Sequence, residues 1–236
     1  LSPKHPKPHI QHILDDSCAT AVMCCPSMQD LLPDKLSIPV FLLEDLTASR
    51  GQHNADDPHF GLLPSNRSAM ILYTSGTTGL PKGVLLSHGN LESQVMCLTK
   101  AWKYSYKDVL LHCLPLHHVH GIVNALMTPL QCGGKVIMKP FDPKVVWKLL
   151  LGSNGGDFDP SVTSGDMGNL ERSEGSLVNL FMAVPTMYAK LLQYYDENMQ
   201  DSSILRAFVR ATCLQNIRLM VSGSAALPEN ILSRWD

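Results

Sequence analysis

The sequence predicts an α/β fold in which helices are layered on mostly parallel sheets. Short apolar runs of strand length alternate with segments of helical length along the chain. Two of these runs, 108–114 and 177–184, are mostly apolar, which is typical of strands buried within a parallel sheet. The third observation is a loop at 73–83 that is rich in glycine and hydroxyl side chains and lies between two apolar runs.

Local signals mark where the elements begin and end. Ser87 offers an N-cap for one helix, Pro185 stands in the first turn of another, and Gly133 with Gly134 ends a third. The predicted strands are 19–25, 40–43, 69–73, 84–86, 108–114, 135–138, 177–184 and 217–222. The predicted helices are 10–15, 91–102, 119–130, 143–151, 185–195, 204–214 and 228–235.

Two segments interrupt the alternation of strands and helices. Residues 47–68 are polar and contain glycines and prolines, so we interpret them as an exposed connector. Residues 152–176 have few apolar side chains and several glycines, and cannot bury enough surface to order themselves. We expect this second segment to be a disordered insertion.

Composition excludes several classes of function. The chain has 236 residues, of which 44% are hydrophobic, enough for the packed core of one domain or two small ones. A net charge of -2 with 17% charged residues argues against a nucleic-acid partner, and no apolar run is long enough to span a membrane. No targeting segment is evident, although the sequence begins with Leu1. Seven cysteines without a C-x-x-C pair indicate reduced thiols, with neither disulfides nor a zinc site.

The loop at 73–83 has the chemistry of a phosphate-binding loop. Its glycines let main-chain N–H groups approach an anion, and Lys82, next to the stiff Pro81, supplies a positive charge. A polar surface turn is the alternative, and a Walker A loop is disfavoured because Gly83 rather than Ser or Thr follows the lysine. The predicted phosphate-binding residues are Thr74, Ser75, Gly76, Thr77, Thr78, Gly79 and Lys82.

The run 73–83 resembles the phosphate loop of the adenylate-forming enzymes, which include acyl-CoA synthetases, peptide-synthetase adenylation domains and luciferases. This resemblance implies a two-step reaction. A carboxylate attacks the α-phosphate of ATP, pyrophosphate leaves, and the acyl group of the adenylate then passes to a thiol. By this resemblance the cofactors are ATP, Mg²⁺ and coenzyme A as acyl acceptor, and Lys82 is catalytic.

A second motif, at 114–121, contains three of four histidines that lie within nine residues. By spacing alone it is more typical of a helix start with capping histidines, and no cysteine or carboxylate nearby supports a zinc site. The run 115–121 resembles the second motif of the adenylate-forming family, whose histidine borders the acyl and adenylate pocket. That resemblance assigns a catalytic and substrate-binding role to His118, which could orient the reacting carboxylate.

A third motif, at 220–228, is a strand that runs into a turn of small residues. A tight strand-to-helix turn is the simple interpretation. In this order after the other two motifs, it resembles the family segment that lies against the adenine and the acyl group. The resemblance places Ser224 and Ala225 at the nucleotide, where small residues let a flat base approach the backbone.

The runs 114–126 and 218–228 resemble one branch of the family, the mitochondrial malonyl-CoA synthetases. This resemblance favours malonate or methylmalonate as substrate and the mitochondrial matrix as location; without it, we would expect a cytoplasmic protein. A dicarboxylate needs cations or strong donors, and His118, His120 and Arg218 are the candidates. At the start of a strand, Arg218 is more often part of a structural ion pair.

We expect residues 1–236 to be an incomplete large N-terminal AMP-binding domain. The family's magnesium-binding glutamate, its ribose-binding aspartate and its C-terminal lid domain with the catalytic lysine have no match in the sequence. The parent enzyme is then an acid–thiol ligase acting on small molecules, and these residues alone are expected to be inactive. The alternative is a catalytically inactive nucleotide-binding or interaction module, which a missing C-terminal lysine region in the full-length gene product would favour.

Overall fold

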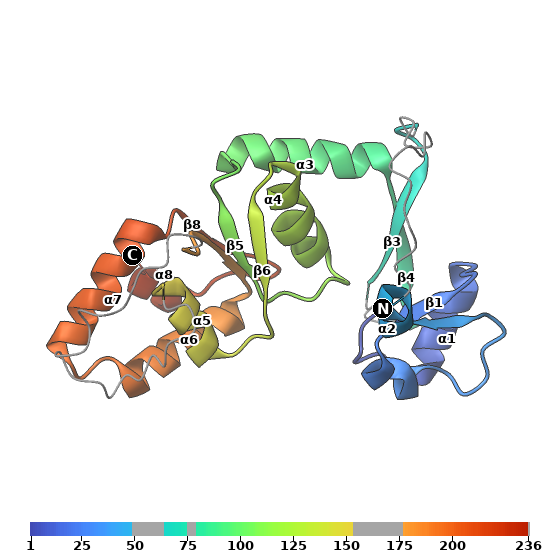
Figure 1. The fold of residues 1–236 in the computed structure, drawn as a ribbon, viewed down its shortest axis with the longest axis horizontal. Coiled ribbons are helices and arrows are strands. Elements are labelled where there is room, and N and C mark those ends of the chain that lie inside the picture. The colour runs from blue at the N-terminus through green and yellow to red at the C-terminus, as the bar shows by residue number, and fades with distance from the viewer. Residues whose placement is uncertain (49–63, 75–78, 153–176, 236) are drawn as a thin grey trace. The chain divides into compact units, whose positions relative to one another are not determined.

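The computed structural model describes residues 1–48, 64–74, 79–152 and 177–235, and its ribbon is drawn in Figure 1. The chain divides into two units, Leu1–Ser93 and Gln94–Asp236. In the described part of the chain, no helix is both long and apolar enough to cross a bilayer. All seven cysteines are free thiols.

The first unit begins with a small layer of one helix on two strands. Helix α1 (Lys7–Asp16) packs on a parallel pair formed by β1 (Val22–Cys24) and β2 (Val40–Leu42). A 3-10 helix, η1 (Pro26–Leu31), separates the two strands, and α2 (Leu43–Ala48) follows them. The buried side chains that join this layer are Ile10, Leu14, Val22 and Leu32.

The same unit contains an antiparallel hairpin. Strands β3 (Ser68–Thr74) and β4 (Lys82–Ser87) pair from Ser68–Ser87 to Thr74–Lys82. Helix α3 (His88–Trp102) begins directly after β4, because Ser87 Oγ accepts the N–H of Asn90 at 3.1 Å while Asn90 Oδ1 accepts the N–H of Ser87. The predicted N-cap at Ser87 is therefore confirmed.

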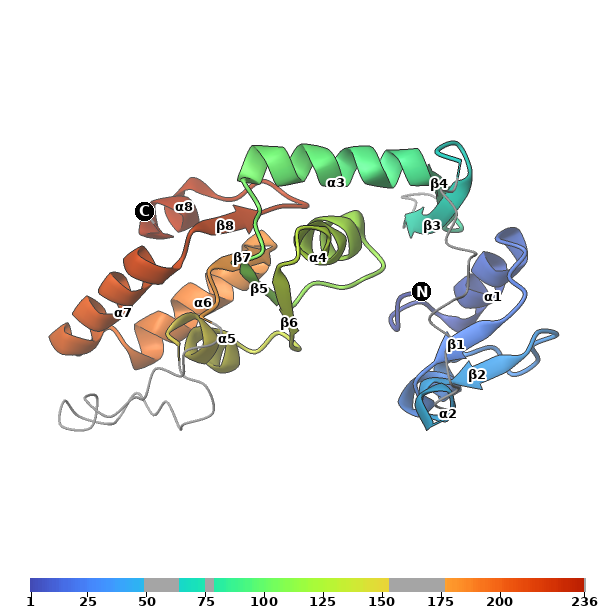
Figure 2. The same cartoon turned by 45° about the horizontal axis from the view of Figure 1, so that its top comes forward.

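The second unit is built on a parallel sheet with the strand order β6-β5-β7-β8. The chain passes from β5 to the neighbouring β6 and then crosses back to β7. Because such connections are right-handed, this reversal places the helices on both faces of the sheet (Figures 1 and 2). The strands are β5 (Val109–His112), β6 (Lys135–Met138), β7 (Leu180–Ala183) and β8 (Leu219–Ser222).

Alternate residues of these strands form two cores. Leu110, Leu180 and Met182 pack on one face, against the helical segment that joins β5 to β6. The opposite residues, which include Leu111 and Phe181, pack against the later helices. Each fully buried leucine contributes about 2 kcal/mol to stability. The later helices are α5 (Pro143–Leu150), α6 (Pro185–Asn198), α7 (Ser203–Asn216) and α8 (Glu229–Trp235).

The helical segment after β5 differs from the predicted regular helix at 119–130. It consists of a π-helix, η2 (His120–Met127), and one turn of α-helix, α4 (Thr128–Gln131). Pro129 has no N–H to donate within the helix, and its ring clashes with the carbonyl four residues earlier. The N–H of Thr128 therefore bonds to the carbonyl of Val123, which is five residues earlier rather than four. The wider turn lies next to the histidine-rich motif, and π-turns are frequent at functional sites.

The prediction of an α/β fold with a mostly parallel sheet is confirmed. Of the predicted connector 47–68, residues 49–63 lie outside the described residues, and 64–67 are exposed. The predicted insertion 152–176 lies, apart from Gly152, outside them as well. The domain boundaries therefore stay predictions.

Candidate active site

The predicted phosphate loop stands at the end of the β3–β4 hairpin. Thr74, the last residue of β3, lies opposite Lys82, the first residue of β4, and both are exposed. Thr74 Oγ1 donates to the carbonyl of Lys82 at 3.4 Å. A Cβ at Gly79 would meet no atom of the described residues within 4 Å. Ser75, Gly76, Thr77 and Thr78 lie outside the described residues.

The second group of predicted residues lies at the carboxyl ends of the parallel strands in the second unit. The strand order reverses between β5 and β7, and doubly wound sheets bind ligands beyond the carboxyl ends of the strands at such a point. The histidine-rich motif follows β5, and the turn of the small-residue motif follows β8. The fold therefore brings these two motifs, which are about 100 residues apart, to one edge of the sheet.

His112 and Gly121 shape the turn that carries the other histidines. His112 is buried, and its Nε2 bonds to the carbonyl of Gly121 at 2.9 Å, with the histidine as donor because a carbonyl can only accept. A Cβ at Gly121 would come within 2.1 Å of the carbonyl oxygen of Pro115, so only glycine permits this close approach. The turn between these residues places His118 on the surface, and the centroids of the His118 and His117 rings are 4.3 Å apart.

His120 joins the two motifs. Its Nδ1 lies 3.4 Å from Ser224 Oγ, and a Cβ at Gly223 would come within 2.8 Å of its ring. Ser224 has a positive φ of 68°, a conformation that a non-glycine residue adopts at a cost. Burial and the nearby His112 lower the pKa of His120, so its ring tends to be neutral. Its Nε2 is buried and has no hydrogen-bond partner among the described residues.

Ala225 follows Ser224 on the exposed part of the same turn. The predicted nucleotide residues of the second unit are therefore adjacent to His120. Cys113, directly after β5, is not a candidate nucleophile, because burial raises the pKa of its thiol to about 11.

Arg218 lies at the other end of the sheet, before β8. Its Nη2 donates to Asp108 Oδ2 at 2.9 Å and its Nε to Asp108 Oδ1 at 3.0 Å. Asp108 is only 2% exposed and also accepts from the side chain of Asn179. The structure thus does not bring Arg218 together with His118 and His120, and it pairs the guanidinium with a carboxylate of this chain.

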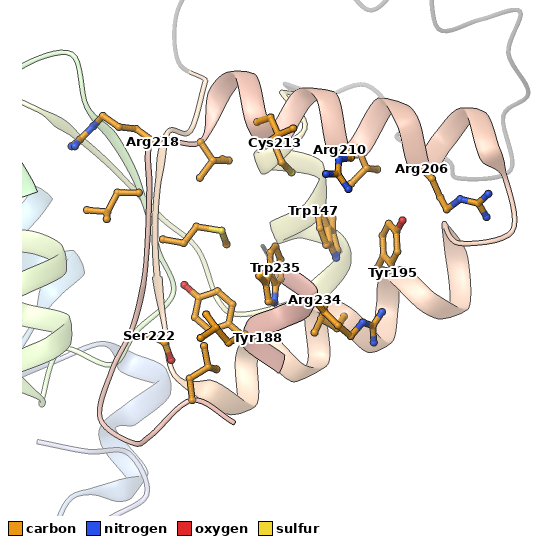
Figure 3. Close-up of a pocket in the computed structure, with 18 of the residues that line it drawn as sticks. Trp147, Tyr188, Tyr195, Arg206, Arg210, Cys213, Arg218, Ser222, Arg234 and Trp235 are labelled. Atoms are coloured by element: carbon orange, nitrogen blue, oxygen red, sulfur yellow. The ribbon is translucent and has the colours of Figure 1, made fainter. Parts of the chain in front are cut away.

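A hollow of about 1020 Å³ lies beside β8, between α6, α7 and α8 (Figure 3). Trp147, Tyr188 and Trp235 line it, and the rings of the two tryptophans stack with their centroids 5.5 Å apart. Arg218 borders this hollow, whereas neither His118 nor Ser224 does. The hollow therefore borders the small-residue motif through Met220, Ser222 and Leu227, but not His118 or Ser224.

Two residues at the ends of the sheet escaped the sequence interpretation, Gly223 at the carboxyl end and Asp108 at the amino end. Gly223 was not singled out, although its position directly before Ser224 in a turn of small residues was a usable signal. Asp108 was treated as the start of an apolar strand, and a lone carboxylate before a buried run was the available hint that it needs a cationic partner. In the described ranges, no group of three or more His, Cys, Asp or Glu side chains could hold a metal ion.

The second unit has a doubly wound sheet with polar motifs at the carboxyl ends of its strands. This arrangement is typical of α/β proteins that bind small molecules at that edge. The chain is a member of the AMP-binding enzyme family, because residues 1–154 match the model of that family. The predicted membership of the adenylate-forming superfamily is thus confirmed.

Individual relatives define the branch. The chain is 41% identical over 240 residues to mitochondrial malonate–CoA ligase ACSF3 of Bos taurus, covering 98% of this chain and 37% of that protein. A malonyl-CoA ligase in a ternary product complex with methylmalonyl-CoA and AMP has a TM-score of 0.72 and 28% identity, over 99% of this chain and 42% of that one. ATP-bound MatB from Rhodopseudomonas palustris has a TM-score of 0.72 and 27% identity, over 100% and 41% of the two chains. The chain therefore spans about two fifths of the length of these relatives.

Proposed function

We propose that this chain forms part of an ATP-dependent acyl-CoA ligase that acts on malonate or methylmalonate. The observation that carries the proposal is the 41% identity to a malonate–CoA ligase along 98% of the chain. The solved relative with bound methylmalonyl-CoA and AMP supports the same substrate class. The mitochondrial relatives support the mitochondrial matrix as its location.

The reaction we propose has two steps. A carboxylate oxygen attacks the α-phosphorus of ATP, the bond to the β-phosphate oxygen breaks, and pyrophosphate leaves. The sulfur of coenzyme A then attacks the acyl carbon, loses its proton, and releases AMP. In the first step negative charge moves onto the departing pyrophosphate, where a fixed cation lowers the barrier most.

The β3–β4 hairpin, which we call the phosphate hairpin, carries the groups that the first step needs. Lys82 and Thr74 stand opposite each other at the exposed end of the hairpin. We propose that Lys82 neutralises the phosphates as pyrophosphate departs. The other proposed phosphate contacts come from hydroxyl and main-chain groups of Ser75, Gly76, Thr77 and Thr78.

The carboxyl edge of the sheet fits the acid and the nucleoside. We propose that His118 orients the reacting carboxylate and that His120 contributes a hydrogen bond through its unpartnered Nε2. Ser224 and Ala225 are proposed to lie at the nucleotide. We assign Arg218 no contact with the acid, because Asp108 already holds its guanidinium.

Mg²⁺ accompanies ATP in reactions of this kind, where it neutralises phosphate charge. The described residues hold no set of carboxylates suited to it, so we assign it no ligand and no step. We propose that these 236 residues do not complete the reaction alone, since they span only 37% of a complete relative.

ATP–pyrophosphate exchange in the full-length protein tests the first step. With malonate as the acid, Lys82→Ala is expected to slow exchange about a hundredfold, because one electrostatic donor is worth about 3 kcal/mol in the transition state. His118→Ala is expected to impair malonate use while the protein stays folded. Exchange at the normal rate in Lys82→Ala contradicts the assignment, and a protein that binds ATP without malonate-dependent exchange is instead a nucleotide-binding module.

A further inference from the structure

The phosphate hairpin is tied to α1 at both of its strands. All of these elements belong to the first unit, and Figures 1 and 2 both show α1 beside the hairpin end that carries the loop. One tie is made by Tyr73, one residue before the end of β3. The other is made by Pro81, directly before β4 begins.

At the entrance to the loop, Tyr73 Oη donates a hydrogen bond to Asp16 Oδ2 at 2.6 Å. Asp16 is the last residue of α1. Partial burial and the Asp16 carboxylate together raise the pKa of Tyr73 to about 12, so the hydroxyl keeps its proton and remains a donor at neutral pH. Hydrogen bonds to a charged acceptor are stronger than neutral ones.

At the exit of the loop, His12 Nε2 lies 3.0 Å from the carbonyl oxygen of Pro81. A proline carbonyl can only accept, so His12 is the donor and its Nε2 carries the proton. Pro81 is itself buried, and its ring fixes the backbone φ just before Lys82. His12 and Asp16 are one turn apart on α1, so a single rigid helix holds the two sides of the loop.

We propose that α1 is the positioning element of the phosphate loop, and that the Tyr73–Asp16 and His12–Pro81 bonds fix where Lys82 stands. The inference rests on the proposed function of Lys82. The transition state gains from a cation only if the cation is already in place as charge develops. A hairpin end tied on one side only lets Lys82 sample positions away from the phosphates.

The two hydrogen bonds between α1 and the hairpin can be removed without removing the apolar contacts that hold α1 in place. The helix packs through Ile10, Ile13 and Leu14, which are all buried, whereas Asp16 is exposed and His12 is partly exposed. Removing the polar partners therefore leaves the apolar contacts of the helix intact. Asp15 offers a matched control, since it is an exposed carboxylate on the same turn that bonds to Gln11 instead.

The test measures ATP–pyrophosphate exchange in the full-length protein. Tyr73→Phe, Asp16→Ala and His12→Leu are each expected to lower kcat about tenfold with the KM for ATP within about twofold, because the lost alignment matters mainly in the transition state. Asp16→Asn and His12→Gln keep an acceptor and a donor, respectively, and are expected to recover most of the rate. Asp15→Ala is expected to match the wild type.

A double-mutant cycle and amide exchange complete the test. Tyr73→Phe combined with Asp16→Ala is expected to be no slower than either single variant, because both remove one bond. In the 236-residue chain, these variants are expected to exchange the backbone amides of 79–87 faster, while Asp15→Ala does not. Unchanged kcat in all three variants, alongside a large loss in Lys82→Ala, overturns the inference and leaves the proposed function standing; no loss in Lys82→Ala overturns the proposed function itself.

Discussion

The two ends of the parallel sheet in the second unit differ in how their buried charged and polar groups are hydrogen-bonded. At the amino ends of the strands, the buried Asp108 receives hydrogen bonds from Arg218, from Asn179 and from the N–H of Ser105. At the carboxyl ends, His120 Nε2 and Ser222 Oγ are buried without a partner in the described part of the chain, and Ser224 holds a positive φ. The charged groups at the amino end are matched to each other, although Tyr104 Oη beside Arg218 has no partner among the described residues, whereas the histidine and the serine at the carboxyl end both have none.

We infer from this difference that one end of the sheet contributes mainly to stability and the other mainly to ligand binding. Buried polar groups without partners cost free energy, and a protein keeps them where a ligand can supply the missing partners. A network whose donors and acceptors are already matched has nothing to offer a substrate. We therefore expect substitutions at the amino end to change the stability of the fold, and those at the carboxyl end to change binding more than stability.

The largest effect is expected at Arg218. Arg218→Ala removes both charged contacts to a carboxylate that is 2% exposed, and should lower the free energy of unfolding by about 3 kcal/mol. Urea unfolding measures this change, with Arg210→Ala, an exposed arginine of α7, as the control expected to stay within about 0.5 kcal/mol. If Arg218→Ala instead kept full stability and weakened malonate binding, the amino end would belong to the substrate site.

A smaller effect is expected at Ser224. Its φ of 68° suits glycine and disfavours β-branched residues, so Ser224→Val should destabilise the fold by roughly 2 kcal/mol while Ser224→Gly costs less than about 0.5 kcal/mol. Thermal unfolding of the two variants gives the comparison. Equal losses for valine and glycine would show that the backbone at this turn carries no strain.

The smallest effect concerns the protonation of His120. Its pKa is lowered in the folded protein, so below about 6.5 the unfolded chain binds a proton that the folded chain does not. Its contribution to stability is thus complete above that pH and declines as the pH falls toward the folded pKa. Urea unfolding between about pH 7.5 and 5.5 should show a weaker pH dependence in His120→Asn than in His118→Asn, and identical profiles would remove His120 as the cause.

Local patterns predicted the strands and helices of the fold well. The apolar runs 108–114, 135–138 and 177–184 contain β5, β6 and β7, and Pro185 opens α6 as expected. The order of the strands was beyond these patterns, since β6 and β7 follow each other in the chain but lie on opposite sides of β5. The π-turns of η2 depend on the backbone at Pro129, which periodicity does not register.

The site was predictable where one motif carries it and not where distant residues meet. Lys82 and His118 stand in motifs that a short window reveals. The bond between Tyr73 and Asp16 joins positions 57 apart, and the contact of His120 with Ser224 joins positions 104 apart. No local pattern encodes such pairs, because each residue alone is an ordinary polar residue of a helix, strand or turn.

The Asp108–Arg218 pair also has a consequence for the order in which the protein folds. The two residues are 110 positions apart in the sequence. Asn179, in the segment before β7, donates a hydrogen bond to Asp108, and its side-chain oxygen accepts the N–H of Val109. This network can close only after β5, β7 and β8 have assembled, because the loop-closure entropy of so long a segment must first be offset by the strands themselves. We therefore expect this ion pair, between the buried Asp108 and the exposed Arg218, to form late in folding and to affect the rate of unfolding more than the rate of folding.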